Sequence, residues 1–127
     1  MHIKLTSIMV DDQDKALRFY TEIFGFRKKT EIPVGVYRWL TVVSPEGNDD
    51  HELSLEPNAN PAARTFQEAM FQQGIPLAAF EVDDLAAEYA RLRKAGVVFT
   101  QPPTQAGAVQ IAVCADTCGN LIQLYQK

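Results

Sequence analysis

The sequence predicts an α+β fold made of two βαβββ modules within a chain of 127 residues. The predicted order of strand, helix and three strands occurs twice. The tripeptide Val10-Asp11-Asp12 also returns 72 residues later as Val82-Asp83-Asp84, before a second helix. An internal repeat of this kind indicates a duplicated unit. We expect a single domain over residues 1–127, with module one over about 1–60, module two over about 75–127 and a helical linker between them.

The first module begins with a predicted strand over residues 2–10. Asp12 then suits the N-cap of a helix over 13–24, which carries apolar side chains at helical spacing and stops at Gly25. Strands are expected over 26–32 and 36–43, broken by Pro33 and Gly35. Residues 44–49 have turn composition, and a fourth strand follows over 51–56.

The linker and the second module repeat this plan. Pro61 opens a predicted helix over 62–73, and Gly74 follows it. A strand over 77–82 precedes a helix over 85–95, which Asp83-Asp84 cap and Gly96 ends. We expect strands over 97–100, 108–115 and 121–126, with Pro102-Pro103 as a break and residues 116–120 as a turn.

Composition and charge limit the possible partners and the location. The net charge of -4 argues against nucleic acid or an anionic membrane, because both attract a basic surface. Cys114 and Cys118 form neither a disulfide framework nor a zinc motif, so we interpret them as inert thiols. No signal peptide and no apolar run of about 20 residues is present, and we expect a cytoplasmic protein.

Two stretches resemble a known family. One is Val10-x-Asp12-x-x-x-Ala16-x-x-Phe19-Tyr20-x-x-x-Phe24-Gly25-Phe26, and the other is Asp116-x-x-Gly119-Asn120-x-Ile122-Gln123-Leu124. Together they resemble the opening and closing motifs of the glyoxalase/bleomycin-resistance/dioxygenase superfamily, also called vicinal oxygen chelate proteins. The resemblance implies a glyoxalase/bleomycin-resistance/dihydroxybiphenyl dioxygenase-like fold. It also implies a cupped site between the modules and a homodimer.

The same resemblance implies four metal-ligand positions, usually held by His, Gln or Glu. Counting from the motifs places them at Leu5, Glu52, Leu77 and Gln123. Leucine has no lone pair to offer a cation, and one carboxylate with one amide oxygen makes a poor transition-metal site. We therefore expect no metal cofactor; if a divalent metal is present, Glu52 and Gln123 would hold it.

Strand alternation predicts which side chains share a face with those four positions. Met9, Glu56, Glu81 and Leu121 are placed on these faces, and Tyr37, Trp39 and Thr41 occupy every second position of the third strand and so share one of its faces. An apolar, aromatic and acidic lining suits a planar or cationic guest. The expected ligand-binding residues are Leu5, Ser7, Trp39, Glu52, Ser54, Leu77, Ala79, Gln123 and Tyr125.

The functional hypothesis is a small-molecule-binding protein that sequesters an apolar, aromatic or cationic ligand. The alternative is a divalent-metal-dependent lyase, isomerase, thiol transferase or dioxygenase of the same superfamily, in which the metal polarises a substrate oxygen. A third hypothesis is an interaction domain whose cup is only structural. No Ser–His or Cys–His pair is evident, so the sequence identifies no catalytic residue and leaves enzymatic activity open.

Overall fold

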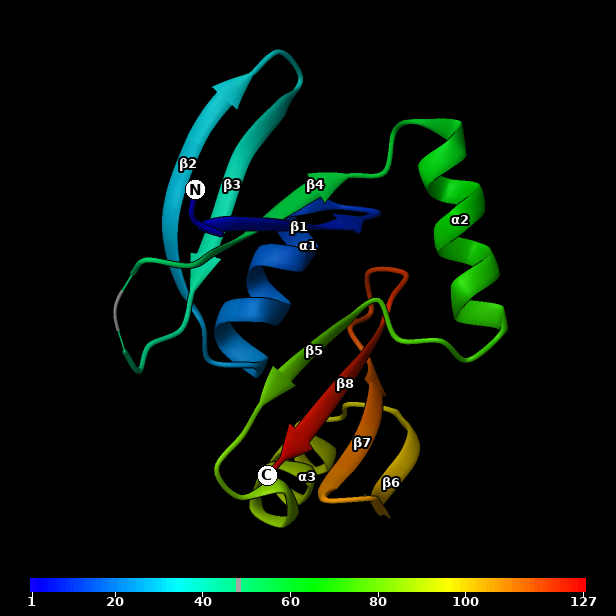
Figure 1. Ribbon diagram of the computed structural model, residues 1–127. Helices are drawn as coiled ribbons and strands as arrows, with labels where there is room; N and C mark the ends of the chain where they lie inside the picture. The colour runs from blue at the N-terminus through cyan, green and yellow to red at the C-terminus, as the bar shows by residue number, and fades with distance from the viewer. Residues whose placement is uncertain (48) are drawn as a thin grey trace. The chain divides into compact units, whose positions relative to one another are not determined.

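The computed structural model describes residues 1–47 and 49–127 (Figure 1). The chain divides into two compact units, Met1–Thr65 and Phe66–Lys127, and each is described by itself. Each unit contains one four-stranded mixed sheet and a helix on one of its faces. This arrangement confirms the predicted α+β class with a duplicated βαβββ unit.

Unit one holds a sheet in the order β1-β4-β3-β2. Strand β1 runs parallel to β4, whereas β3 runs antiparallel to both β4 and β2. Its elements are β1 (Leu5–Val10), α1 (Gln13–Arg18), the π-helical turn η1 (Phe19–Ile23), β2 (Arg27–Val34), β3 (Tyr37–Val43) and β4 (Glu52–Pro57).

One face of this sheet forms the core of unit one. Ile8, Val10, Leu40, Val42 and Leu55 are all buried, and they alternate along their strands with side chains of the other face. Helix α1 packs on this apolar face. Burial of each large aliphatic side chain contributes roughly 1.5–3 kcal/mol to folding. We call this apolar side of the sheet, on which α1 packs, the helix face of module one.

The first helix begins as predicted but changes its pitch. The Asp12 carboxylate accepts a hydrogen bond from the Lys15 N–H at 3.1 Å, which caps α1. That hydrogen bond is the main cause of a lowered pKa for Asp12. The expected α-helix over 13–24 is regular only to Arg18, after which Phe19–Ile23 forms the π-helical turn. Apolar spacing at this length does not distinguish the two helix types.

Unit two repeats the pattern with a sheet in the order β5-β8-β7-β6. Its buried Leu85 and Leu92 lie on α3, and the Asp84 carboxylate caps that helix by accepting from the Ala87 N–H at 3.0 Å. The boundary between the units falls within α2 (Pro61–Gln72). The elements that follow are β5 (Ala78–Glu81), α3 (Leu85–Lys94), β6 (Phe99–Ala106), β7 (Val109–Ala115) and β8 (Leu121–Gln126).

The prediction that Pro102-Pro103 breaks the chain was wrong, because both prolines lie inside β6. Strand β6 is at the edge of its sheet and pairs only with β7. Its register shifts between Gln101 and Thr104, across the two prolines. An edge strand tolerates proline at such an irregularity, since the missing N–H interrupts no central ladder.

The repeat can be measured along the whole chain. Strands β2 and β3 reappear 72 residues later as β6 and β7, but β4 reappears after 69 residues as β8. The change arises in the segment between the last two strands, which spans residues 44–51 in module one and residues 116–120 in module two. Part of the turn expected over 44–49 lies outside the described residues, since residue 48 is not described.

Among the described residues, the helices are too short or too polar to cross a bilayer.

Candidate functional site

The sheet of module one has a second face, opposite α1, which we call the opposite face. Cross-strand pairing joins Leu5 to Glu52, Ser7 to Ser54 and Met9 to Glu56, so these side chains share it as alternation predicted. Thr41 pairs with Ser54, which adds the alternating residues of β3. Further members from β2 and β3 are Thr30, Ile32, Val34, Tyr37 and Trp39.

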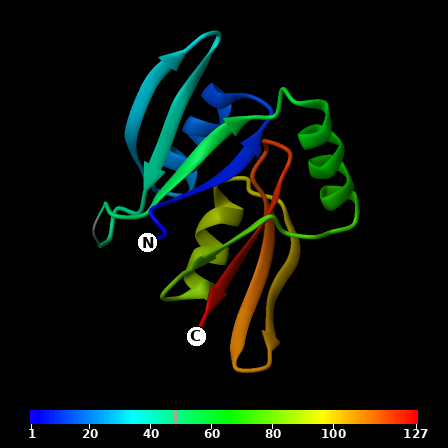
Figure 2. The same ribbon diagram turned by 45° about the horizontal axis from the view of Figure 1, so that its top comes forward.

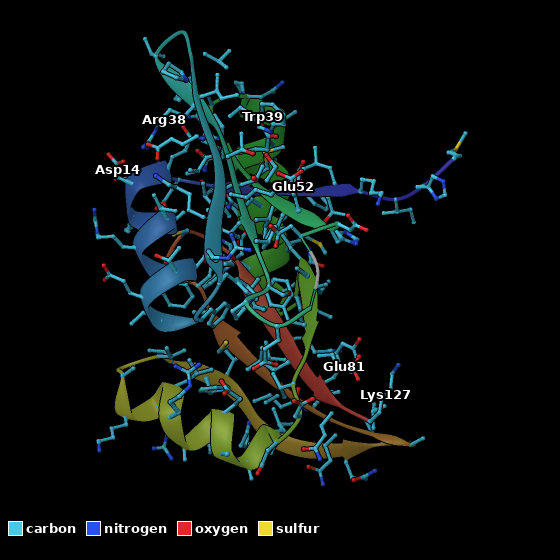
Figure 3. The ribbon with its side chains drawn as sticks, turned by 90° about the vertical axis from the view of Figure 1, so that its left-hand side faces the viewer. Asp14, Arg38, Trp39, Glu52, Glu81 and Lys127 are labelled. Carbon is cyan, nitrogen blue, oxygen red and sulfur yellow. The ribbon has the colours of Figure 1, made fainter. Side chains whose placement is uncertain are left out.

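Several large apolar side chains of the opposite face are exposed. Trp39 and Tyr37 are each 43% exposed, Leu5 is 44% exposed and Ile32 is 47% exposed. Figure 3 shows Trp39 and Glu52 on this side of the sheet, whereas Asp14 and Arg38 lie on the α1 side. A cluster of exposed aromatic and aliphatic side chains on a sheet is typical of a surface that binds a ligand or another macromolecule.

Glu52 is held by several partners. Its Oε1 accepts hydrogen bonds from the hydroxyls of Thr41 at 2.7 Å and Thr30 at 3.3 Å. The Lys29 Nζ lies 3.7 Å from its Oε2. Lys29 is the extra residue of a β-bulge between Lys28 and Thr30. The Glu52 charge is therefore offset within module one, and much of its acceptor capacity is used.

Glu56 lies two residues further along β4 and is half-buried. The hydroxyl of Ser54, which is buried, donates to its Oε1 at 2.8 Å. Among the described residues Glu56 forms no ion pair. Its carboxylate thus keeps spare acceptor capacity beside the apolar Met9 side chain.

The structure reveals a polar residue whose role the sequence did not indicate. Gln13, the first residue of α1, is buried at 7% exposure. Its Nε2 donates to the carbonyls of Arg38 at 2.7 Å and Leu55 at 2.9 Å, and its Oε1 accepts from the Arg38 N–H at 3.1 Å. The repeat carries Leu85 at the equivalent position. Comparison of the two modules could have identified Gln13, because module one has a glutamine where module two has a buried leucine.

The equivalent face of module two has a different character. Ala79 pairs with Gln123 and Glu81 with Tyr125. The Tyr125 hydroxyl lies 3.5 Å from the Glu81 carboxylate, and Lys127 Nζ lies 3.9 Å from the same group. Figure 3 shows Glu81 and Lys127 near each other. Leu77 lies just before β5, and its N–H donates to the Leu121 carbonyl.

Strand register corrects one step of the sequence analysis. Counting from the motifs made Glu52 the counterpart of Gln123. In the structure Ser7 pairs with Ser54, and its repeat equivalent Ala79 pairs with Gln123. Ser54 is therefore the counterpart of Gln123, because the last strand follows the 69-residue offset.

The residues at the expected metal positions do not fit a divalent cation. Leu5 and Leu77 have no donor atom, and Ser54 or Gln123 supplies only a neutral oxygen. Glu52 is already bound by Thr41 and Lys29. No group of three or more His, Cys, Asp or Glu side chains in the described part of the chain could hold a metal ion.

The two cysteines are free and buried, as their interpretation as inert thiols requires. Burial, together with the smaller effect of the negative charge of Asp116, raises the pKa of the Cys114 thiol to about 12. A thiol with so high a pKa holds almost no thiolate near neutral pH, and the thiolate is the nucleophile.

Comparison with known proteins identifies the family. The model of the Glyoxalase/Bleomycin resistance protein/Dioxygenase superfamily matches residues 2–124. The chain belongs to this superfamily, which confirms the resemblance of its two motifs.

Three relatives illustrate its range. The chain is 54% identical to the uncharacterized protein YurT of Bacillus subtilis, over 100% of both chains. It is 25% identical to a probable lactoylglutathione lyase of Vibrio cholerae, over 96% of this chain and 88% of that protein. The crystal structure of TnmS3, an antibiotic-binding protein from a Streptomyces species, matches with a TM-score of 0.78 and 31% identity, over 99% of this chain and 95% of that one.

Proposed function

We propose that this protein binds a small apolar, aromatic or cationic molecule on the opposite face of module one and sequesters it without a metal of its own. Ligand-binding surfaces combine apolar and aromatic area with a few placed polar groups. Here Trp39, Tyr37 and Leu5 supply the area, and the carboxylates on β4 supply negative charge. The candidate ligand-binding residues of module two are Leu77, Ala79, Gln123 and Tyr125.

The observation that carries the proposal is the exposed indole of Trp39 on the opposite face. On the same face, Leu5 occupies a position where a metal ligand was expected. An exposed Trp loses its contact with water when a flat guest stacks on it, which favours binding. The relation to TnmS3 at 31% identity supports the same type of function.

The experiment is a titration followed by Trp39 fluorescence, since this is the sole Trp in the chain. The panel contains planar aromatic cations, neutral aromatics and aliphatic amines. We expect at least one compound to quench the emission and to raise the thermal midpoint. A ligand at ten times its Kd adds about 1.4 kcal/mol to the free energy of unfolding.

Substitution Trp39→Ala should weaken that binding. The variant has no Trp, so its affinity is measured by the rise in the thermal midpoint that the ligand causes relative to the unliganded variant. The matched control is Tyr89→Ala, which removes an aromatic side chain from α3 in the other unit. This control should lower the midpoint but leave the affinity unchanged. If no compound of the panel changes fluorescence or midpoint, the proposal fails.

A second candidate is a metal-dependent enzyme, favoured by the relation to the Vibrio cholerae protein and by the carboxylate of Glu52 on the opposite face. Metal analysis of the untagged protein separates the two functions. Stoichiometric nickel, zinc, manganese or iron, with a turnover that a chelator abolishes, would establish the enzyme. Binding that survives chelation would support sequestration.

A further inference from the structure

Strands β3 and β4 diverge, unlike their counterparts in module two. They share only the pairs Thr41–Ser54 and Val42–Leu53, whereas β7 and β8 pair along their full length from Gln110–Gln126 to Ala115–Leu121. Figures 1 and 2 both show β4 turning away from β3 as it runs toward α2. The two modules therefore provide an internal comparison of a split and an intact sheet.

Gln13 lies where the strands separate. Its amide contacts the backbone of Arg38 on β3 and of Leu55 on β4, and so replaces direct pairing between them. Backbone groups that already have the Gln13 amide as a partner gain little from pairing with the neighbouring strand. At this position module two has Leu85, which cannot form such bonds, and its strands stay paired.

The divergence brings one aromatic and one acidic residue to its two sides. Trp39 and Glu56 each lie two residues beyond the last pair on the opposite face, Thr41–Ser54. In module two the corresponding residues are Ile111 and Tyr125, which form an ordinary cross-strand pair. Only module one thus combines an indole and a carboxylate at this point.

The carboxylates of the two faces differ in their charge partners. Glu52 has Lys29 at 3.7 Å and Glu81 has Lys127 at 3.9 Å. Within the described chain Glu56 has only the neutral Ser54 hydroxyl. A cation beside Glu56 would therefore be attracted by a carboxylate that no basic side chain of the described residues neutralises. The Trp39 ring offers its negative π face on the other side.

We propose that Trp39 and Glu56 form a recognition pair for a planar aromatic cation, with the ring on the indole and the positive charge at the Glu56 carboxylate. This inference rests on the proposed function and names its ligand class. It assigns the charge selectivity to Glu56 and not to Glu52, although Glu52 is nearer to the paired region of the two strands.

The test compares N-methylacridinium with acridine by isothermal titration calorimetry in mildly alkaline buffer. The two compounds share one ring system, but only the first carries a fixed positive charge. The native protein should bind the cation more tightly than the neutral compound. Glu56→Gln should reduce this preference roughly tenfold, the effect of losing one hydrogen-bonded charge, and leave the acridine affinity unchanged.

Glu68→Gln is the matched control, because it removes the same charge from an exposed site on α2. It should preserve the preference. If Glu56→Gln also preserves it, or if only Glu52→Gln reduces it, the inference is overturned. Binding of both dyes with equal affinity would overturn this inference alone, whereas binding of neither dye, together with an inactive compound panel, would overturn the proposed function as well.

Discussion

At the scale of single residues, a hydrogen-bonded network organises the turn between β7 and β8. The buried Asp116 carboxylate accepts from the N–H groups of Cys118 at 2.7 Å and Asn120 at 3.0 Å. Gln67 from α2 donates to the Asn120 side chain at 3.0 Å. Gly119 lies beneath the Gln67 amide with φ +101°. The D-x-x-G-N motif is therefore a structural turn that attaches α2 to module two.

Gly119→Ala should destabilise the protein by about 1–3 kcal/mol. A Cβ there would lie 2.8 Å from the Gln67 Nε2, and the positive φ adds backbone strain. Urea denaturation would measure the change. Gly107→Ala is the control, since Gly107 has φ +63° but no neighbouring atom within 4 Å. The steric argument is wrong if the two variants lose equal stability.

The thiol of Cys114 should resist alkylation by iodoacetamide in the folded protein and react once urea unfolds it. Its raised pKa of about 12 keeps the folded thiol neutral. The unfolded thiol ionises at its ordinary, lower pKa, so the free energy of unfolding should fall as the pH rises from that value toward 12. Rapid labelling of the native protein near neutral pH would contradict this assignment.

At the scale of elements, Gln13→Leu should destabilise module one although leucine is the natural residue of the repeat. The change leaves the Arg38 N–H and two carbonyls without their present partner. Unsatisfied groups of this kind, of which one is buried and two are partly buried, cost about 2–4 kcal/mol in total. Urea denaturation again provides the measurement. Gln110→Leu on an exposed position of β7 should change stability by less than about 0.5 kcal/mol. Equal effects would show that Gln13 contributes no more than a surface amide.

Most elements could be predicted because their signals are local. The caps Asp12 and Asp84, and the alternation along β1 and β4, depend on neighbours in sequence. The errors came from features that depend on tertiary position. Prolines 102 and 103 are tolerated because β6 is an edge strand, and edge status is not encoded in the segment itself.

At the scale of the whole molecule, duplication allowed the fold to be predicted but misled the placement of one site residue. A constant offset of 72 holds from Leu5 and Leu77 through Thr41 and Val113. The shorter last turn of module two then changes it to 69, and only strand pairing reveals that Ser54 matches Gln123. The face of each candidate could be predicted from alternation, whereas its exact partner could not.

The ion pair between Glu52 and Lys29, and the lack of an ion pair at Glu56 among the described residues, could likewise not be predicted from the sequence. Lys29 approaches Glu52 from a β-bulge, and a bulge places a side chain where simple alternation does not. The motif match made Glu52 the candidate functional carboxylate. The sequence carried no information about its charge partner Lys29, so nothing in it argued against that choice.

The alternation of side chains in β3 and β4 has a consequence for substitution. Residues that maintain the core, such as Leu40 and Leu55, alternate with residues of the proposed binding face, such as Trp39 and Glu56. Substitution of the exposed members of that face, such as Trp39, would therefore change its chemical preference and leave the buried core residues of the same strands in place.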